Sequence, residues 1–355
     1  MAMFEQKINR TLEEVHHLAL KQKKLTGFCI GTTRKTNSTG LYFSPIRNTV
    51  RLIAGSVIVY NREEAQNIAS QVDGKVDYIL LDSEKKISLK INNDQSSEDI
   101  ESTVRAVVRS SKILTYKGND LAVDSIESLV VQILSTSSRG LSGKKATIIG
   151  AGNIGSKLAL KLVERGMNVT ITRRDLTKLK VIVAALNFIK TSETFTTISG
   201  TTDNLVAAKN TDLLIGLTVG SPLITAAMIN AVSPGATLID AGKGCFLPEA
   251  ISLATNKKII IHRADIRSGF EGYIGLALET ERMIKSLGRK RINGVSVVSA
   301  GLLAERNEVV VDNVYDLQTV FGVADGMGDF IRGHDARQAE SIQLVQQHID
   351  GRRLQ

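Results

Sequence analysis

The chain has 355 residues, of which 43% are hydrophobic and 23% are charged, and this ordinary globular composition excludes a disordered tail protein and a coiled-coil rod. The length favours two domains over one. Aromatic residues make up only 4% of the chain, so few side chains are available to stack on bases. The formal charge of +9 suits an anionic ligand such as a phosphorylated cofactor, or nucleic acid, and does not decide between them.

The N-terminal segment predicts an amphipathic helix from Phe4 to Lys24, because its apolar residues recur every three to four positions. Its charged residues exclude a signal peptide and a membrane span, so we expect a cytoplasmic protein with no membrane contact. Cys29 and Cys245 cannot form a disulfide framework, and the five His residues show no metal-ligand spacing. We therefore expect no metal site.

The first 115 residues alternate between short strand patterns and helical patterns, which favours βαβ units and a mainly parallel sheet. The predicted strands are Gly27–Gly31, Val50–Ile53, Ser56–Tyr60 and Tyr78–Leu81, with a helix at Arg62–Gln71. The polar segment Asp82–Asp99 is expected to be a surface loop. Two helices follow, at Ser97–Ser111 and Leu121–Leu134, and the Ser-rich stretch 135–140 after them is the best domain boundary.

A second alternating series begins at Ala146 and has the pattern of a doubly wound α/β fold. Its predicted strands are Ala146–Ile149, Val169–Thr172, Leu213–Leu217, Thr237–Ile239 and Ile259–Ile261, and its helices are Ile154–Arg165, Leu176–Phe188, Ile224–Val232 and Pro248–Thr255. The C-terminal part carries a strand at Val309–Val311 and an amphipathic helix at Arg337–Ile349, which we expect to pack back onto one of the domains.

The sharpest motif is G-x-G-x-x-G at Gly150, Gly152 and Gly155, directly after a strand and before a helix. The first glycine permits a tight turn, the second lets the backbone approach a pyrophosphate, and the third allows close packing of helix on strand. The free N–H groups of the helix that begins near Asn153 and Ile154 attract phosphates. The motif therefore predicts that a dinucleotide binds here.

The second strand of this series ends in Arg173 and Arg174, where an NAD enzyme commonly places an acidic residue. Arginines at this position can pair with a 2′-phosphate, so we expect NADP(H), with NAD(H) as the alternative because Asp175 follows. The other interpretation is a pair of exposed arginines without a partner.

Two further turns lie at the carboxyl ends of strands, the edge where an open parallel sheet binds its ligand. The first turn supplies candidates for the nicotinamide ribose, and the second supplies candidates for the nicotinamide or the substrate. They are Thr218, Gly220 and Ser221 in the first, and Gly242, Lys243 and Gly244 in the second. The alternative is that both sets are ordinary turn residues.

Residues 141–152 and 166–175 resemble the cofactor half of shikimate dehydrogenases and of their relatives, the methylene-tetrahydrofolate dehydrogenases and glutamyl-tRNA reductases. The resemblance implies a smaller α/β catalytic domain before a Rossmann domain. Tyr116–Asp124 is similar to the family's Gly-x-Asn-Thr-Asp segment without the Thr, which implies that Asn119 and Asp120 lie at the interdomain cleft, where the family uses the Asp with a Lys for proton transfer. The alternative is that Asn119 and Asp120 cap a helix starting at Leu121.

The chain also departs from this family. Its catalytic Lys motif has no match, although Lys35 and Lys117 are available, and the C-terminal Gln-containing substrate motif is missing. We therefore do not expect shikimate as the substrate. The hypothesis is a biosynthetic NADP(H)-dependent oxidoreductase that transfers hydride to or from a small polar, carboxylate-bearing ketone, alcohol, imine or amine in the cleft. Lys117, Asp120 or Lys243 would carry the proton.

The predicted organisation is an α/β substrate domain at 1–118, a connecting helix and linker at 119–140, a Rossmann domain at 141–300 and a C-terminal segment at 301–355. We expect a homodimer that does not bind nucleic acid. Two alternatives remain: a regulator that senses NADP(H) without turnover, and an RNA-linked reductase with Cys29 as its nucleophile. The charged residues Arg263, Asp265, Arg267 and Glu271 either hold a carboxylated substrate or pair with each other.

Overall fold

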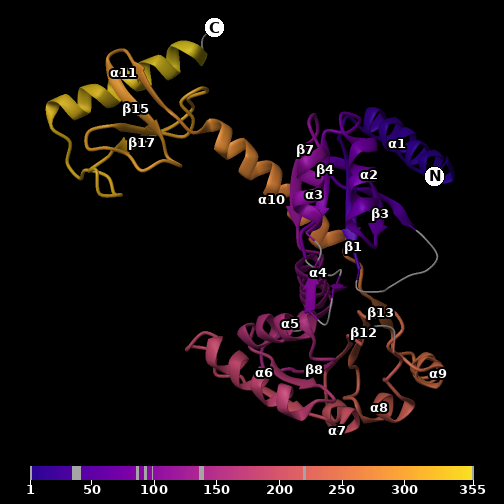
Figure 1. The fold of residues 1–355 in the computed structure, drawn as a ribbon. Coiled ribbons are helices and arrows are strands. Elements are labelled where there is room, and N and C mark those ends of the chain that lie inside the picture. Colours follow the sequence, from indigo (N-terminus) through magenta and orange to yellow (C-terminus); the bar gives the residue numbers. More distant parts are fainter. Residues whose placement is uncertain are drawn as a thin grey trace. The chain divides into compact units, whose positions relative to one another are not determined.

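The computed structural model describes residues 2–33, 41–84, 88–91, 94–97, 99–135, 140–218 and 221–353. The chain divides into two compact units, unit 1 (Met1–Ile274) and unit 2 (Gly275–Gln355). Unit 1 contains two sheets, here called the first and second sheet, and unit 2 contains a third (Figure 1). Each is described by itself.

The first sheet has five strands in the order β2-β3-β1-β4-β7, in which only β2 runs antiparallel to its neighbour. The strands are β1 (Leu25–Thr32), β2 (Tyr42–Asn48), β3 (Leu52–Val59), β4 (Tyr78–Asp82) and β7 (Lys112–Tyr116), and the helices that pack on them are α1 (Ala2–Gln22), α2 (Arg62–Val72) and α3 (Ile100–Val107). Buried side chains of α1 and α2, such as Ile8, Leu12 and Ile68, join Phe28 and Ile30 of the central strand in one apolar core. The predicted mainly parallel sheet is confirmed.

Several predicted boundaries in this region are wrong. The two strands expected on either side of Gly55 are one strand, β3, because its small residues Ala54 and Gly55 pair in register with β1 and make room for α1: a Cβ at Gly55 would lie 2.5 Å from Thr11 Cγ2. The helix predicted at Ser97–Ser111 is limited to α3, and β7 follows it. With five residues, β7 is too short for hydrophobic periodicity to identify it as a strand.

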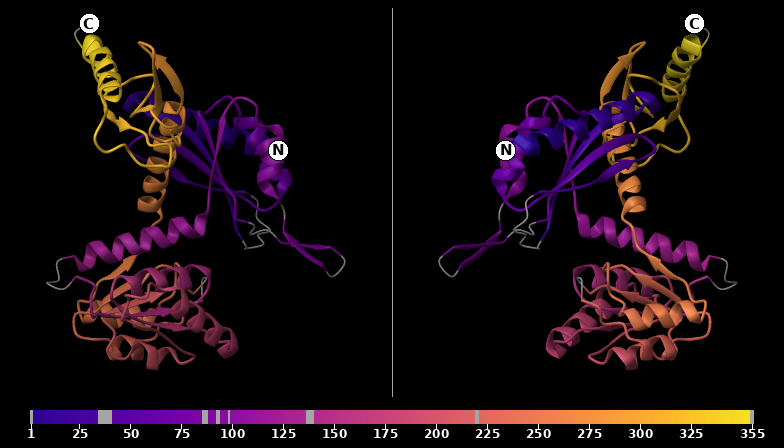
Figure 2. Two further views of the ribbon diagram at one scale, coloured as in Figure 1. Left: turned by 90° about the vertical axis from the view of Figure 1, so that its left-hand side faces the viewer. Right: turned by 90° about the vertical axis from the view of Figure 1, so that its right-hand side faces the viewer.

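The polar segment that was predicted to be a surface loop is also different in the structure. Asp82 is the buried last residue of β4, and β5 (Ser88–Ile91) and β6 (Asp94–Ser97) form an antiparallel hairpin. Figure 2 shows this hairpin projecting beyond the first sheet. The alternation of Ile87, Leu89 and Ile91 is the period-two pattern of a strand, but the many polar and charged residues around it favoured a loop.

The second sheet is fully parallel, with its six strands in the order β10-β9-β8-β11-β12-β13. The strands are β8 (Lys145–Ile149), β9 (Asn168–Thr172), β10 (Ile198–Thr201), β11 (Leu213–Gly216), β12 (Thr237–Asp240) and β13 (Ile261–Arg263). Counted from β8 this order is 3-2-1-4-5-6, that of doubly wound nucleotide-binding folds, and the direction of winding reverses between β8 and β11. The predicted fold class is confirmed, although β10 was not predicted and β13 begins at the last residue of its predicted strand.

Helices cover both faces of the second sheet, as the two apolar clusters that flank it show. The helices are α4 (Gly118–Leu134), α5 (Asn153–Glu164), α6 (Leu176–Ile189), α7 (Asn204–Ala208), α8 (Ala226–Ala231) and α9 (Pro248–Asn256). One cluster joins α4 and α5 to β8 and β9 through residues such as Val130, Leu158 and Ile148. The helix α4, which leads into this region, therefore contributes to the core of the second sheet.

Unit 2 is built on a four-stranded sheet in the order β14-β15-β16-β17. Its elements are β14 (Arg289–Ile292), β15 (Val295–Ser299), β16 (Val309–Val311), β17 (Val320–Val323) and α11 (Ala336–Arg353); α10 (Arg267–Ser286) begins in unit 1 and ends in unit 2. Figure 1 shows α11 lying across this sheet, where Val345 and Ile349 pack on its valines. The predicted strand at Val309–Val311 and the final helix are confirmed, whereas β14, β15, β17 and α10 were not predicted.

Candidate active site

The turn between β8 and α5 accommodates only glycine at two positions. Gly150 has φ of +114°, and a Cβ on it would lie 2.8 Å from the carbonyl oxygen of Leu217. A Cβ on Gly155 would lie 2.3 Å from the carbonyl oxygen of Gly150. Positive φ and backbone contacts this short exclude other residues without a shift of the chain. The first and third glycines therefore shape the turn.

Gly152 differs from the other two glycines, because a Cβ on it would meet nothing within 4 Å. It is the N-cap of α5, its φ is −92°, and no side chain caps this helix. The first helical bond runs from Ser156 N–H to Gly152 O over 2.9 Å, so the N–H groups of Asn153, Ile154 and Gly155 precede it. The turn thus offers open space beside free donors at a helix N-terminus, a fit for phosphate oxygens.

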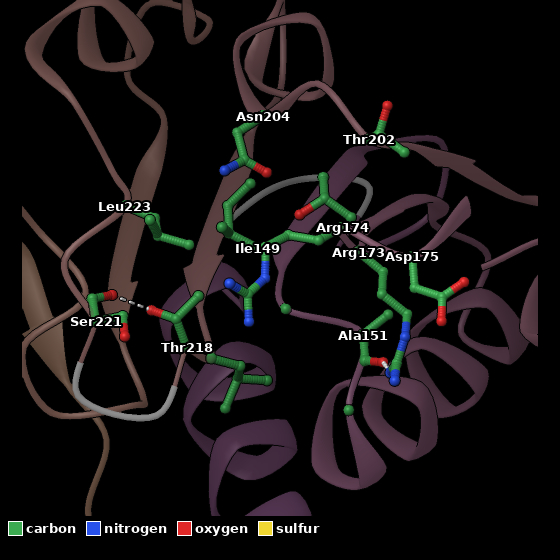
Figure 3. A pocket seen from close by; sticks show the side chains of 14 residues that line it. Ile149, Ala151, Arg173, Arg174, Asp175, Thr202, Asn204, Thr218, Ser221 and Leu223 are labelled. Carbon is green, nitrogen blue, oxygen red and sulfur yellow. Dashed lines mark hydrogen bonds between the residues drawn. The ribbon is translucent and has the colours of Figure 1, made fainter. Parts of the chain in front are cut away.

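These residues border a cavity of about 500 Å³ at the carboxyl ends of the strands, shown in Figure 3. The lining comes from the turns after β8, β9 and β11 and from the start of α7. The lining residues are Ile149, Gly150, Ala151, Gly152, Thr172, Arg173, Arg174, Asp175, Thr202, Asn204, Leu217, Thr218, Ser221 and Leu223. The cavity therefore lies in the crevice where the order of the second sheet reverses, the ligand position of this fold.

The two arginines after β9 have different surroundings. Arg173 is half-buried, and its Nη1 donates to the carbonyl oxygen of Ala151 over 2.6 Å, while its Nε is buried without a hydrogen-bond partner. Arg174 is exposed and has no hydrogen-bond or ion-pair partner among the described residues. In Figure 3 the Arg173 guanidinium lies at Ala151, and the Arg174 side chain extends over the cavity. Arg174 is thus the arginine available to an anionic group.

Asp175, the residue that an NAD enzyme would turn to a ribose hydroxyl, is the N-cap of α6. Its carboxylate accepts from Lys178 N–H over 3.0 Å. That backbone hydrogen bond, and then the nearby charges of Lys178 and Arg173, hold the pKa of Asp175 below its usual value. The carboxylate is engaged in helix capping, while Arg174 is free.

The structure places the candidates in the later turns as follows. Thr218 lines the cavity and donates its hydroxyl to the carbonyl oxygen of Ser221 over 2.6 Å, while Gly220 lies outside the described residues. A Cβ on Gly242 would lie 2.5 Å from the carbonyl oxygen of Thr218, so the turns after β11 and β12 touch at these positions. Lys243 is exposed and has a left-handed φ of 60°, a strained conformation for a residue with a side chain.

Asp120 is the centre of a charged cluster at the start of α4. Its Oδ2 lies 3.2 Å from Lys117 Nζ, and its Oδ1 accepts a short hydrogen bond from Lys157 Nζ of α5. Partial burial raises the pKa of Asp120, but the hydrogen bonds from Lys157 and Lys117 outweigh this effect and keep the pKa below its usual value. The carboxylate is therefore ionised near neutral pH, and it holds two ammonium groups.

The interpretation of Asn119 and Asp120 as helix caps is wrong, because α4 begins at Gly118 with Lys117 as its N-cap and no side-chain cap. The N–H groups at this helix start bond to side chains at and just after the end of β4 instead, Asn119 N–H to Glu84 Oε2 over 2.9 Å and Gly118 N–H to Asp82 Oδ1 over 3.4 Å. Sequence analysis missed Lys157. Its position two residues after Gly155 suggests a surface lysine, and only the packing of α5 against α4 brings it to Asp120.

Cys29 is unsuited to the nucleophilic role considered for it. The side chain is 1% exposed within β1, and burial raises the pKa of its thiol to about 12, an effect that the charge of Arg47 only reduces. A thiol with this pKa is not a thiolate at neutral pH, and the thiolate is the reactive form. Its surroundings therefore count against an RNA-linked reductase that uses Cys29.

The charged residues after β13 are partly paired with each other. Arg267 Nε lies 3.1 Å from Asp265 Oδ2, and Glu271 accepts from the N–H of Val50 over 2.9 Å. Arg263 has no ion-pair partner among the described residues. Within the same residues the structure holds no group of three or more His, Cys, Asp or Glu side chains arranged for a metal, and no helix with the length and apolarity of a membrane span.

Comparison with known families finds a match to this region. Residues 127–262 match the NAD binding domain of D-isomer specific 2-hydroxyacid dehydrogenases. The match covers the glycine turn and the cavity, and it supports an NAD(P)-dependent dehydrogenase with a Rossmann-type nucleotide-binding domain. The predicted resemblance to the shikimate dehydrogenase group in particular is not confirmed. No curated protein sequence matches the chain.

Solved structures similar to the chain have low sequence identity. Dipicolinate synthase A chain from Bacillus subtilis is 13% identical, with 73% of this chain and 97% of that chain covered and a TM-score of 0.35. L-tryptophan dehydrogenase from Nostoc punctiforme is 14% identical, with 74% and 75% covered and a TM-score of 0.42. D-lactate dehydrogenase from Escherichia coli is 11% identical, with 72% and 97% covered and a TM-score of 0.33.

Proposed function

We propose that the chain is an NADP(H)-dependent oxidoreductase that interconverts a small carboxylate-bearing ketone or imine with the corresponding alcohol or amine. The observation that carries the proposal is the glycine turn, whose open space at Gly152 and free N–H donors fit a pyrophosphate. The free Arg174 beside it favours a 2′-phosphate over a bare ribose hydroxyl, because Asp175 is engaged in capping. Residues 1–118 would form the substrate domain.

The residues that would hold the cofactor follow from the cavity. The N–H groups of Asn153, Ile154 and Gly155 would bind the pyrophosphate, Arg174 the 2′-phosphate, and Thr218 the nicotinamide ribose. The buried Nε of Arg173 has no hydrogen-bond partner, so it is a further donor at this end of the cavity. When bound, the nicotinamide ring donates or accepts a hydride at the substrate carbon.

The charged cluster at Asp120 would handle the accompanying proton. Because the pKa of Asp120 is lowered, its carboxylate is a weak base, and its main effect is to hold the ammonium groups of Lys117 and Lys157 in place. An ammonium group held in this way can give a proton to the carbonyl oxygen or imine nitrogen that is reduced, and the amine can take it back in the oxidation. Lys243, exposed and strained at the end of β12, is the third candidate donor.

The proposal can be tested with Gly152→Ala. The added methyl meets no protein atom and φ is −92°, so this variant should fold as the wild type does, yet it places a methyl where the pyrophosphate would lie. Calorimetry should show saturable NADPH binding to the wild type and a loss of about tenfold or more in the variant, the loss of one charge-assisted hydrogen bond or more. Equal affinity would contradict the assigned position of the pyrophosphate.

Turnover should be followed by absorbance at the nicotinamide band during a screen of keto acids, imines and cyclic enones. Oxidation of NADPH by one of these substrate classes supports the reaction. If the protein bound no pyridine nucleotide, oxidised or reduced, the proposal would be wrong. Saturable binding without turnover across the three classes would favour the regulator that senses NADP(H).

A further inference from the structure

Unit 2 has a small cavity of its own, of about 230 Å³, which we call the basic pocket. Strand β14 and the turn after it supply one wall, and the C-terminal half of α11 supplies the opposite wall. The lining residues are Lys290, Arg291, Ile292, Asn293, Val314, Leu317, His348 and Arg352. All belong to unit 2, so the pocket is separate from the cofactor cavity of unit 1.

The positive charge of the basic pocket is local. Unit 2 has ten Lys and Arg residues against eleven Asp and Glu, so its overall charge does not require a basic surface. The pocket lining nevertheless includes three cations and His348 but no carboxylate. The neighbouring Arg289 is neutralised by Glu308 at 3.1 Å, whereas Lys290, Arg291 and Arg352 have no acidic partner among the described residues. Like charges that share a pocket favour an anion between them.

Packing holds one wall of the pocket in place. Asn293 and Gly294 have φ of 49° and 83°, the paired positive angles of a tight hairpin turn between β14 and β15. Lys290 Nζ lies 5.5 Å from the centre of the Tyr315 ring, a cation–π contact that orients this side chain. The floor consists of the apolar side chains of Ile292, Val314 and Leu317, which are at most 6% exposed and also pack in the core of unit 2.

We propose that the basic pocket binds a small phosphate monoester. Its phosphate oxygens would accept hydrogen bonds from Arg352, Arg291 and Lys290, for which guanidinium and ammonium groups are the usual donors. The carbon part of the ligand would rest on the floor of Ile292, Val314 and Leu317. Such a ligand has a negative charge, which the cationic walls can bind, and an apolar portion, which can contact the floor.

The first experiment is calorimetry of the full chain with phenyl phosphate in the presence of saturating NAD⁺, which is offered to the cofactor cavity and carries no phosphate monoester of its own. We expect saturable binding that is tighter than that of inorganic phosphate, because only the ester reaches the apolar floor. Arg352→Gln and, separately, Lys290→Gln should each weaken binding about tenfold, the loss of one charge-assisted hydrogen bond. Arg337→Gln removes the same charge from the exposed start of α11 and should leave the affinity unchanged.

The second readout is the side-chain NMR spectrum of the five His residues. The His348 resonance, identified by its loss in His348→Gln, should move with added phenyl phosphate, while that of His334, outside the pocket, should not. The proposal is overturned if phenyl phosphate does not saturate, if Arg337→Gln weakens binding as much as Arg352→Gln, or if polyuridylate binds and phenyl phosphate does not. NADPH binding is measured apart from all of these, so either proposal can fail alone.

Discussion

The glycine turn and the charged cluster at Asp120 both lie near the N-terminal ends of one helix pair, α5 and α4, but they are built from different chemical groups. The turn uses the backbone: its donors are N–H groups, and its shape depends on Gly150 and Gly155. The cluster uses side chains from two helices, with Lys157 of α5 reaching Asp120 of α4. A site built from backbone groups requires glycines at fixed spacing, and this spacing can be recognised in the sequence. A site built between the side chains of two helices requires no such spacing.

The difference predicts how each site responds to substitution. A backbone site should fail through its geometry. A methyl that meets the chain, as at Gly155, disturbs both stability and binding, whereas a methyl at Gly152 disturbs binding alone. A side-chain site should fail in its chemistry and leave the fold intact, because its members are partly exposed. The basic pocket belongs with the second kind. The following variants separate the two kinds of site.

The largest effect is expected from Gly155→Ala. A Cβ 2.3 Å from the carbonyl oxygen of Gly150 forces α5 away from β8, at a cost of about 2–3 kcal/mol in the free energy of unfolding. NADPH binding should be lost as well. Thermal and urea denaturation measure the first effect and calorimetry the second. Gly152→Ala is the matched control for stability, and an unchanged melting temperature in Gly155→Ala would contradict the close approach of helix and strand.

Asp120→Asn should lower turnover about 100-fold, because the amide no longer holds the two ammonium groups, while cofactor affinity stays unchanged. Steady-state kinetics and calorimetry give the two values. Asp124→Asn, one turn later on α4 and paired with Lys161 at 3.1 Å, is the control and should retain turnover. If both variants lost turnover equally, Asp120 would be a member of a structural ion pair with no part in the proton transfer.

Arg174→Ala should weaken NADPH binding by about tenfold, the effect of a lost charge-assisted hydrogen bond, and leave NADH binding unchanged. The ratio of the two dissociation constants is the measurement. Lys180→Ala removes an exposed cation from the following helix and should not alter that ratio. A similar loss of affinity for both nucleotides would show that Arg174 does not bind the 2′-phosphate.

The smallest effect concerns Glu127, which joins α4 to α5 through Lys161 and Arg165, each at 2.7 Å. Burial raises the pKa of Glu127, but hydrogen bonds from Lys161 and Arg165 lower it further, and the net pKa lies below the usual value. A lowered folded-state pKa stabilises the protein above the unfolded pKa of about 4.3, and that stability is lost as pH falls through the folded pKa.

We therefore expect Glu127→Gln to cost about 1 kcal/mol at pH 7, since both cationic partners are partly exposed. The difference from the wild type should shrink as pH falls below about 4. Urea denaturation at several pH values measures it. A difference independent of pH would show that the charge of Glu127 is not its source.

Much of the second sheet could be predicted from the chain alone. Runs such as Ala146–Ile149 and Leu213–Gly216 are buried on both sides, and their sequences predict strands without tertiary information. The first sheet was harder. β3 is a single strand only because α1 fits over Gly55, which leaves no periodic signal. The alternation of Ile87, Leu89 and Ile91 around β5 is a strand pattern, but it is short and lies among polar residues.

The doubly wound fold and the glycine turn can be inferred from the order of residues alone, because a parallel sheet needs apolar strands and a phosphate turn needs glycines at fixed spacing. Which charges meet depends on the folded chain. In the fold Arg173 donates to the carbonyl oxygen of Ala151, whereas Arg174 has no partner among the described residues. Lys157 pairs with Asp120. Lys290, Arg291 and Arg352 line one pocket. Electrostatic contacts depend on the distance between side chains in space, and the order of residues along the chain does not set that distance.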